Sequence, residues 1–350
     1  MKKMYVLLLL LALLIGAQAA AEAEEKSIRL TFTGDVTLGC EEILRREAYS
    51  LVGYAQEHGY DYFFEKVEPL FSADDLTVVN LEGVLSDSAK GENKKKNFRF
   101  RGPAEYVNIL RAGSVEAVNT ANNHTMDYGK AGLEATKAAL DAAGVARFGE
   151  EDVFIYEKDG IKIAFLGVYY DDFGQKKPRI ETQMAQLRDT VNAIVFSFHA
   201  GREYAEQHMQ AQEEYAQFAI DLGADLVIMH HPHVVQGMDV YQNRSVFYSL
   251  GNFCFGGNRH AKVLESLVVG AELRFDADGT YIGQQITLYP AYTTGETTHN
   301  NYQPYLVSGE AAENVMRLVQ QDTPFELVPF DEEAGCAVQP YLPAESGAGA

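Results

Sequence analysis

Cysteine and basic residues are scarce in this 350-residue chain, and each scarcity excludes a class of protein. Three cysteines, an odd number, do not make a disulfide framework. We expect all three to be ordinary small residues, and a bond between Cys40 and Cys254 stays open. Lysine and arginine number 29 against 50 acidic residues, which gives a formal charge of -21. A surface this acidic disfavours non-specific binding to nucleic acid or anionic lipid, so no nucleic-acid partner is expected.

The motifs of several common enzyme classes are also missing. The chain has no GxSxG nucleophile elbow, no paired CxxC motif and no GxGxxG that follows a predicted strand. Gly129 and Gly132 open a predicted helix, but their spacing is not that of a phosphate-binding loop. These absences exclude the serine-hydrolase and dinucleotide-binding interpretations.

Long apolar runs are confined to the N-terminus. Lys2 and Lys3 precede an almost unbroken apolar stretch over residues 6–15, and small residues follow it up to Ala20. This pattern predicts a secretory signal peptide over residues 1–19, and its removal would change the formal charge from -21 to -23 because two lysines are lost. The stretch of about ten residues is shorter than the roughly 20 that a membrane span needs. We therefore expect an exported protein, extracellular or associated with the cell envelope; the alternative is an uncleaved N-terminal anchor.

The rest of the chain alternates short β-rich apolar runs with helical patterns, which predicts an α/β fold. Several predicted strands are apolar throughout, as in strands buried on both faces, and residues 153–156 and 161–168 predict a hairpin that makes the sheet mixed. The predicted strands cover residues 28–33, 76–80, 115–119, 161–168, 193–198, 225–229 and 245–249, and the predicted helices cover 62–71, 104–112, 130–143, 184–191 and 203–222. We expect one domain over residues 27–332 and a disordered tail over 333–350, which is rich in Ala, Gly, Pro and Glu.

Polar side chains follow the predicted strands at the point where each strand ends. Because ligands of open α/β sheets bind beyond the carboxyl ends of the strands, we expect these side chains to share one site. Imidazole nitrogens and carboxylate or amide oxygens bind zinc, manganese or iron, so the set predicts a site for one or two such divalent ions. The predicted ligands are Asp35, Glu82, Asn123, His199, His231 and His233.

The segments that carry these residues are FTGDVTLG, VVNLEGVLSD, FRFRGPAEYV, NTANNHTMDYGKAGLEATKAAL, FSFHAGREY, GADLVIMHHPHVVQGMDVY and FYSLGNFCF. They resemble the bacterial capsule-synthesis protein CapA family, which is associated with poly-γ-glutamate synthesis and is a branch of the calcineurin-like metallophosphoesterase superfamily. The resemblance implies two packed mixed β-sheets flanked by helices, with a metal site at one edge. It also implies an anionic polymer such as poly-γ-glutamate as substrate and membrane-bound polymer synthesis machinery as a partner.

The resemblance implies a role for each predicted ligand of the first metal. Asp35 and His233 resemble its ligands, and Glu82 resembles the carboxylate that bridges to the second metal. Asn80 is the rival of Glu82 for that place. In the wider superfamily a histidine stands two positions after the first aspartate, whereas this chain has Thr37, so the first metal would bind more weakly or be absent.

The second metal and the catalytic group are implied in the same way. Asn123, His199 and His231 resemble ligands of the second metal. His124 matches the superfamily's catalytic histidine, which protonates a leaving group or contacts a phosphoryl oxygen, and Asp127 would orient it. The alternative is a structural histidine that Asp127 fixes in its loop.

Other polar residues near the predicted site have two interpretations each. Arg99 and Arg101 alternate along an extended stretch, so both would lie on one face and clamp an anionic substrate; the alternative is a solvated basic edge. Asn252 would support a ligand or substrate, unless residues 249–253 form only a tight structural turn. The three lysines at 94–96 favour a solvated loop.

Three functions stay open on this basis. The first is an exported metal-dependent hydrolase or transferase that acts on poly-γ-glutamate or a related cell-envelope polymer. The second is a secreted metallophosphoesterase, against which Thr37 argues modestly. The third is a non-catalytic polymer-binding or export-assembly subunit, against which His124 argues because it accompanies a nearly complete ligand set.

Overall fold

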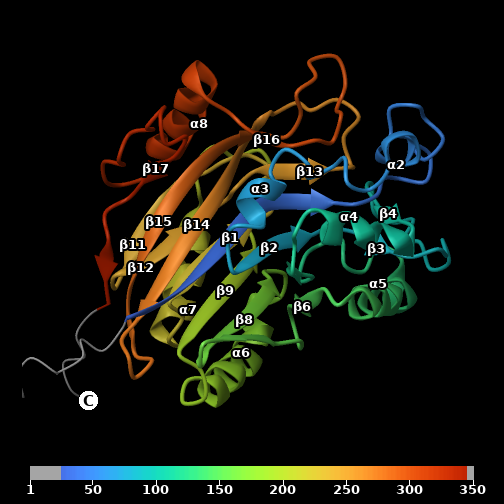
Figure 1. Cartoon of the computed structure of the whole chain (residues 1–350). Coiled ribbons are helices and arrows are strands. Elements are labelled where there is room, and N and C mark those ends of the chain that lie inside the picture. Colours follow the sequence, from blue (N-terminus) through green and yellow to red (C-terminus); the bar gives the residue numbers. More distant parts are fainter. Residues whose placement is uncertain (1–24, 345–350) are drawn as a thin grey trace, which may run out of the picture.

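Helices and strands alternate along residues 25–344, the part of the chain described by the structure, which is a computed structural model (Figure 1). The strands are β1 (Lys26–Thr37), β2 (Leu76–Leu81), β3 (Val84–Leu85), β4 (Arg101–Gly102), β5 (Ala117–Asn119), β6 (Ala146–Phe148), β7 (Phe154–Lys158), β8 (Ile161–Tyr169), β9 (Ala193–His199), β10 (Leu226–His230), β11 (Met238–Tyr241), β12 (Arg244–Phe247), β13 (Asn252–Phe255), β14 (Glu265–Phe275), β15 (Tyr281–Tyr292), β16 (Tyr305–Leu306), β17 (Ala337–Val338) and β18 (Leu342–Pro343). The helices are α2 (Leu51–His58), α3 (Glu68–Phe71), the 3-10 helix η1 (Ala104–Tyr106), α4 (Val107–Ala112), α5 (Gly129–Ala143), α6 (Phe173–Leu187), α7 (Gln210–Asp221) and α8 (Gly309–Gln321). No described helix has both the length and the apolar character that crossing a membrane requires.

The strands form two mixed sheets and one short pair. The larger sheet has ten strands, with the order β16-β15-β14-β1-β2-β5-β6, and β13 lies beside β1 while β17 and β18 lie beside β15. The smaller sheet has six strands in the order β11-β12-β10-β9-β8-β7, and β3 pairs separately with β4. The neighbours β1, β2 and β5 are parallel, as are β8, β9 and β10. Their carboxyl ends therefore gather at one edge of each sheet.

The apolar residues of each sheet pack in two different hydrophobic cores, one on each face of the sheet. Val78 on β2 packs in the cluster between the two sheets, whereas its neighbour Val79 packs in the cluster beneath α3, α4 and α5. In the smaller sheet, Val195 faces the inter-sheet core and Phe196 faces α6 and α7. Because successive side chains of a strand point to opposite faces, both faces of both sheets are buried. The result is the predicted arrangement of two packed mixed sheets between helical layers.

Several predicted elements differ from the structure in extent. The helix predicted over residues 203–222 begins only at Gln210. The residues before Gln210 form a loop instead, because Tyr204 N donates to Pro232 O at 2.8 Å, in the segment after β10. The helix predicted over 62–71 is reduced to α3, and the one predicted over 184–191 is the last part of α6, which contains Pro178. The hairpin predicted over 153–168 is present as β7 and β8. Helices α2 and α8 and the long antiparallel pair β14–β15 were not predicted.

The end of the chain also differs from the disordered tail predicted for residues 333–350. Val338 in β17 pairs with Thr287 and Pro343 in β18 pairs with Gly283, so both strands lie antiparallel to β15. Ala337 is fully buried. The edge of β15 offers unpaired backbone groups, and pairing with it outweighs the composition that suggested disorder. Residues 345–350, like the predicted signal peptide over 1–19, lie outside the described residues.

A close approach of two chain segments fixes the position of Asp35. A Cβ atom at Gly34 would lie only 2.2 Å from the carbonyl oxygen of Gly251, so only glycine fits there. Asp35 N donates to the same oxygen at 2.9 Å, and the pairing of β1 with β2 shifts register between Phe32 and Asp35. Irregularities of this kind re-aim side chains at functional sites. They hold Asp35 at the edge where β1, β2 and β13 meet, opposite Asn80 of β2 and Asn252 of β13; Figure 1 shows these three strands side by side.

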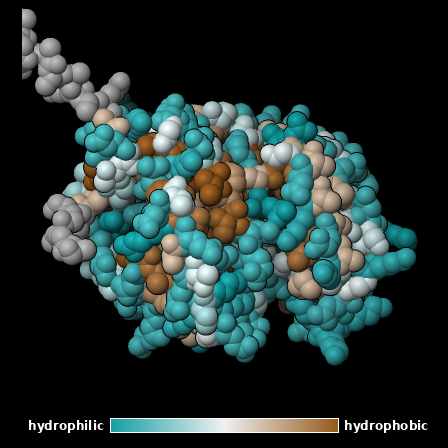
Figure 2. All heavy atoms as spheres, turned by 90° about the horizontal axis from the view of Figure 1, so that it is seen from below, coloured by the Kyte–Doolittle hydropathy of each residue, from teal (hydrophilic) through white to brown (hydrophobic). Residues whose placement is uncertain are grey.

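One face of the molecule has a mostly polar surface. Figure 2 shows one face on which hydrophilic residues predominate and apolar residues gather in limited patches. Single exposed apolar side chains such as Ile43 and Phe98 occur elsewhere in the described chain, which is normal for a folded protein.

Candidate metal centre

The structure brings the six predicted metal ligands together at the edge formed by the carboxyl ends of the parallel strands. The larger sheet contributes three of them and the smaller sheet contributes the other three, so the site lies at the seam between the sheets. The larger sheet positions Asp35 on β1, Glu82 after β2 and Asn123 after β5, and the smaller sheet positions His199 at the end of β9 and His231 and His233 after β10.

Three of these residues form a fully enclosed group. The ligand atoms of Asp35, Glu82 and His199 all lie within 4.8 Å of one another, and none of the three side chains has more than 1% of its surface exposed. His199 Nε2 lies 3.3 Å from Glu82 Oε1 and 3.0 Å from Asn123 Oδ1. Oxygen and imidazole donors therefore converge on one point in the protein interior.

Glu82 provides the test of whether a cation fits this group. Both of its carboxylate oxygens are buried and receive no hydrogen bond from the described residues. Burial raises the pKa of Glu82 well above its ordinary value, and the charge of Asp35 raises it further. An ionised carboxylate removed from water costs several kcal/mol unless a counter-charge or a metal compensates it. The donor set thus fits a divalent metal ion.

Asp35 has the opposite electrostatic environment. Burial would raise the pKa of Asp35, but contacts with His230 and His233 outweigh burial and hold that pKa well below its usual range. The Asp35 carboxylate lies 3.4 Å from His230 Nδ1 and 3.2 Å from His233 Nδ1. Asn80 Nδ2 also donates to Asp35 Oδ1 at 2.8 Å. Asp35 is therefore held as an anion in a fixed orientation.

The two histidines that flank Pro232 adopt unusual backbone conformations. His231 has φ 105° and His233 has φ 59°, values that are uncommon for residues other than glycine and often mark functional sites. His231 Nδ1 lies 3.1 Å from His199 Nε2, and His233 Nδ1 lies 2.9 Å from Asn252 Oδ1. The chain leaves the regular pleat here, and the two rings lie close together, with centroids 6.0 Å apart.

These histidines have different protonation preferences. Burial, together with the charge of His233, lowers the pKa of His231 to about 4. Burial opposes protonation of His233 as well, but the contact with Asp35 and the charge of Glu82 raise the pKa of His233 to about 9. One ring is thus neutral, with a lone pair free to bind a metal, and the other compensates the buried carboxylates.

His124 lies beside the metal ligands and is bound on one side of its ring. Its Nδ1 donates to Asp127 Oδ2 at 2.7 Å, and the ring packs against Phe100 with centroids 4.3 Å apart. Burial lowers the pKa of His124, the contact with Asp127 opposes this, and the net pKa lies below the usual value. Asp127 fixes the ring through Nδ1, a contact that both the catalytic and the structural interpretation of His124 predict.

Lys96 is part of this group, whereas the sequence favoured a solvated loop for residues 94–96. Its ammonium donates to the carbonyl of Asn123 at 2.8 Å, forms an ion pair with Asp127 and lies 3.3 Å from His124 Nδ1. The buried Asp127 carboxylate needs a counter-charge, and Lys96 supplies it. The correction applies to Lys96 alone among the three lysines.

The residues predicted to bind substrate have partners within the protein. Asn80 and Asn252 are buried, and they contact Asp35 and His233 respectively. Arg101 is also buried and donates to Glu42 Oε1 at 2.6 Å and to the carbonyl of Ser86 at 2.6 Å. These contacts favour a supporting role for Asn80, Asn252 and Arg101 over the predicted contact with substrate.

Arg99 is similarly engaged. Its guanidinium pairs with Glu92 at 3.0 Å and donates to the backbone carbonyls of Lys96 and Asn97 at 2.7 Å each. Arg99 and Arg101 therefore bind different acidic residues, and neither the predicted substrate clamp nor a freely solvated basic edge describes them.

Two further residues at the site were missed in the sequence. His230 precedes the predicted pair and contacts Asp35, and its position in the string of three histidines at 230–233 was a usable signal. Glu203 lies near His231 and His233, and the ligand atoms of these three residues lie within 4.8 Å of one another. Glu203 falls in a stretch that was predicted to be helical, so it was not connected with a strand end.

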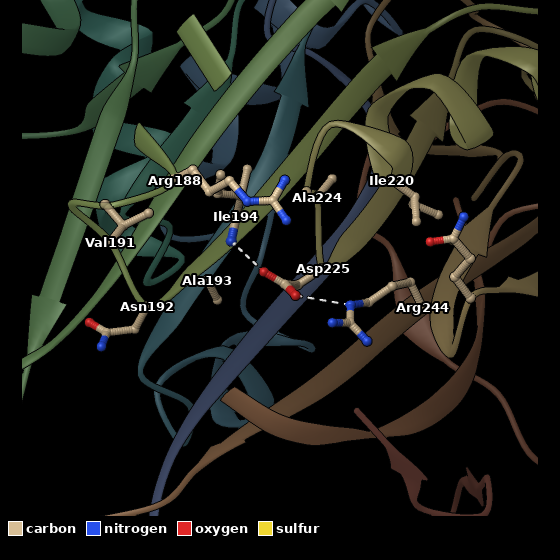
Figure 3. Close-up of a pocket in the computed structure, with 11 residues that line it drawn as sticks. Arg188, Val191, Asn192, Ala193, Ile194, Ile220, Ala224, Asp225 and Arg244 are labelled. Carbon is tan, nitrogen blue, oxygen red and sulfur yellow. Dashed lines mark hydrogen bonds and ion pairs between the residues drawn. The ribbon is translucent and has the colours of Figure 1, made fainter. Parts of the chain in front are cut away.

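A polar pocket elsewhere on the smaller sheet is separate from this site. Figure 3 shows Arg188, Asp225 and Arg244 around it, with Asp225 bound to the amide of Ile194 and to Arg244. Ile194 lies five residues before His199 on β9, which corresponds to about 17 Å along a strand. The pocket therefore lies toward the opposite ends of the strands from the metal-ligand candidates.

Comparison with known proteins places the chain among capsule synthesis proteins. The model of the family "Bacterial capsule synthesis protein PGA_cap" matches residues 29–257. "PGA biosynthesis protein CapA" of Bacillus subtilis (strain 168) is 29% identical over 284 residues, which cover 75% of this chain and 72% of that protein. "Capsule biosynthesis protein CapA" of Bacillus anthracis is 30% identical over 261 residues, which cover 66% of this chain and 61% of that protein, less than two thirds of its length.

Solved structures with related folds are more distant. A phosphatase of Mycoplasma pneumoniae aligns with a TM-score of 0.45 and 13% identity over 76% of this chain and 95% of that chain. The NAD nucleotidase of Haemophilus influenzae aligns with a TM-score of 0.46 and 12% identity over 87% of this chain and 64% of that chain.

Proposed function

The chain belongs to the family of bacterial capsule synthesis proteins, and from this premise we propose that it is a metal-dependent hydrolase or transferase acting on an anionic cell-envelope polymer such as poly-γ-glutamate. The names of its relatives from Bacillus, which refer to capsule and PGA biosynthesis, support the choice of polymer. The observation that carries the proposed chemistry is the Glu82 carboxylate, which is fully buried without a hydrogen-bond donor beside Asp35 and His199.

The residues that would hold divalent manganese, zinc or iron are the six predicted ligands. A bound divalent cation supplies Lewis-acid activation of the substrate and of an attacking water or amine. Asn80 and Asn252 keep Asp35 and His233 in place through the contacts described above. Because the ligands come from both sheets, the packing of the sheets fixes the distance between them.

His124 is the group that would move a proton. Its Nδ1 is bound to Asp127, so only Nε2 is available to the reacting atoms. In cleavage of a γ-amide, the oxygen of water or the nitrogen of an acceptor amine would bond to the carbonyl carbon as its bond to the leaving nitrogen breaks. Protonated His124 would give its Nε2 proton to that nitrogen, and the proton lost by the nucleophile would restore the ring. Lys96, bound to Asp127 and to the carbonyl of Asn123, holds the loop that carries His124.

The acidic chain must still accept an acidic polymer. The formal charge of -21 repels a polyanion over most of the surface. At the site the balance would be different, because the Lys96 ammonium lies beside Asp127 and a bound divalent metal would add positive charge. We expect the polymer's carboxylates to bind here, where the local electrostatic potential would be positive although the rest of the surface is negative.

The proposed function includes export and a membrane partner. The signal-peptide pattern over residues 1–19 supports a location outside the cytoplasmic membrane. A polymer made at the membrane would reach the site there, so we propose that the membrane-bound polymer synthesis machinery is the partner.

The test is an assay of purified protein loaded with manganese, zinc or iron in separate preparations. Poly-γ-glutamate is incubated with and without an amine acceptor, and a chromogenic phosphodiester is assayed in parallel. We expect a change in polymer length or polymer attached to the acceptor, abolished in His124→Ala and His231→Ala. His260→Ala serves as the matched control, because His260 is exposed and bonded to the carbonyl of Thr298.

Two outcomes would replace the proposal. Turnover of the phosphodiester with an untouched polymer would identify a metallophosphoesterase. Polymer binding that survives both histidine substitutions, with no turnover of any substrate, would identify a non-catalytic polymer-binding or export-assembly subunit.

A further inference from the structure

The donors at the site edge divide into two groups that differ in burial. The first, here called the inner position, consists of Asp35, Glu82 and His199, all of them buried. The second, here called the outer position, consists of Glu203, His231 and His233, in which the histidines are buried and Glu203 is exposed. In each group the ligand atoms lie within 4.8 Å of one another. The chain thus offers two places for a cation, and only one of them opens to solvent.

We infer that Glu203 is a ligand of a second divalent cation, which it binds together with His231 and His233 at the outer position. The inference rests on the proposed metal-dependent function and extends it to a residue outside the six predicted ligands. It also assigns His231 and His233 to one ion, whereas the resemblance implied a different ion for each. Two imidazoles and one carboxylate form a common set of protein ligands in catalytic zinc sites, where a further position stays open to water or substrate.

Backbone contacts hold Glu203 next to the histidine pair. The amide of the following residue, Tyr204, donates to the carbonyl of Pro232 at 2.8 Å, and Pro232 stands between His231 and His233. On the other side, Ala200 N donates to the carbonyl of His230 at 2.9 Å. The loop that carries Glu203 is therefore bound, before and after this residue, to the segment that carries the two histidines.

A third contact anchors the far end of the same loop. Gln236 Nε2 donates to the carbonyl of Ala205 at 2.9 Å, and the amides of His208 and Gly237 both donate to Asp322. These bonds join the loop of residues 200–208 to residues 230–237 at several points. The position of Glu203 relative to the histidines is thus fixed by the fold, although its side chain is exposed.

The spacing of the three donors suits one ion. Bonds to zinc of about 2.0–2.2 Å place two ligands of one ion no more than roughly 4.4 Å apart. The ligand atoms of Glu203, His231 and His233 lie within 4.8 Å of one another, so a movement of a few tenths of an ångström at most is needed, which an exposed glutamate side chain makes easily. His231 and His233 are held by other contacts, so Glu203 is the ligand that moves.

The difference in burial predicts a difference in affinity and role. The inner cation would compensate the unsatisfied Glu82 carboxylate in the protein interior and exchange slowly. The outer cation would exchange readily, because one of its three protein ligands lies in solvent. A polymer carboxylate or amide oxygen approaching from solvent would meet the outer cation first.

The experiment counts manganese ions bound to the full chain. Protein stripped with a chelator is titrated with Mn²⁺ by calorimetry, and the loaded protein is examined by electron paramagnetic resonance. We expect two ions per wild-type chain, with the coupled spectrum of a manganese pair, and one tightly bound ion in Glu203→Gln, with the spectrum of an isolated ion. The affinity for the second ion should fall at least tenfold.

Matched variants make the result specific. Glu206 is exposed on the same loop and belongs to neither group, so Glu206→Gln should bind two ions like the wild type. Asp35→Asn should weaken the inner ion instead. If Glu203→Gln keeps the wild-type stoichiometry and affinities, the inference is overturned while the proposed function stands. If the wild type binds no transition metal, both fail together.

Discussion

Replacement of Glu82 by glutamine should stabilise the metal-free protein and abolish its stabilisation by metal. The reason is the position of the carboxylate, which is buried beside Asp35 with neither oxygen hydrogen-bonded by a described residue. Glutamine has nearly the same shape without the charge. The variant therefore removes the electrostatic cost of the buried carboxylate and, with it, the attraction for a cation.

The size of the effect can be bounded from the protonation of the carboxyl group. Burial raises the pKa of Glu82 well above the ordinary value of 4.5, so the metal-free protein favours the neutral carboxyl group over a buried charge. At pH 7 protonation costs at most about 1.36 kcal/mol for each of roughly 2.5 pH units, or about 3.4 kcal/mol. Glutamine does not bear this cost, although its amide needs hydrogen bonds of its own. We expect a gain of about 1–3 kcal/mol.

The assay is thermal unfolding of both proteins at pH 7, first with a chelator and then with excess Mn²⁺. The variant should melt about 2–12 °C higher without metal, at about 2–4 °C for each kcal/mol. Metal at 100 times its dissociation constant adds about 2.7 kcal/mol to a protein that binds it, so the wild type should rise and the variant should not. A variant that melts below the wild type with chelator and still responds to Mn²⁺ would refute the reasoning.

Three further predictions concern the surroundings of the site. Burial opposes protonation of His208, but its contacts with Asp322 and Glu213 raise the pKa of His208 above 6.5. The stability that these contacts contribute is therefore complete below pH 6.5 and lost as pH rises through the raised pKa. In urea titrations, His208→Gln should cost about 1 kcal/mol of unfolding free energy at pH 6 and much less at pH 9. Gly34→Ala places a Cβ 2.2 Å from a carbonyl oxygen, and circular dichroism melts should show a loss of at least about 2 kcal/mol. Arg101→Ala removes the partner of Glu42 and of a buried carbonyl, so the unfolding free energy should fall by about 2 kcal/mol with metal stoichiometry unchanged. A loss of polymer affinity without a loss of stability would instead support the interpretation of Arg101 as a substrate-binding residue.

The parallel core of the fold could be predicted because its strands have a strong local signal. The segments around Val78 and Val195 are apolar in succession, as strands buried on both faces must be. The antiparallel strands β14 and β15 alternate buried and partly buried residues, such as Leu273 and Arg274, and their pairing depends on partners far along the chain. Helix α6 contains Pro178, which conceals a helix from propensity alone.

The convergence of the site could be predicted from the polar residues at strand ends, but the partners of individual side chains could not. The position of Asp35 follows from the end of its strand, whereas the engagement of Arg101 with Glu42 joins residues 59 positions apart. Glu203 was missed because its amphipathic surroundings favour a helix, whereas the hydrogen bond from Tyr204 N to Pro232 O, in the segment after β10, holds these residues outside the helix that begins at Gln210. These tertiary contacts outweigh local propensity.

The position of the site at the seam of the two sheets links metal binding to the stability of the whole domain. Asp35 and Glu82 belong to the larger sheet, and His199 and His231 belong to the smaller one. Without a cation, ionisation of Glu82 is opposed by burial and by repulsion from the Asp35 carboxylate, so the carboxyl group bears the cost of protonation. A cation bound by donors from both sheets replaces the repulsion with bonds that cross the seam. Separation of the sheets would then require loss of the ion, so a metal-loaded domain should unfold in a single step in which both sheets melt together.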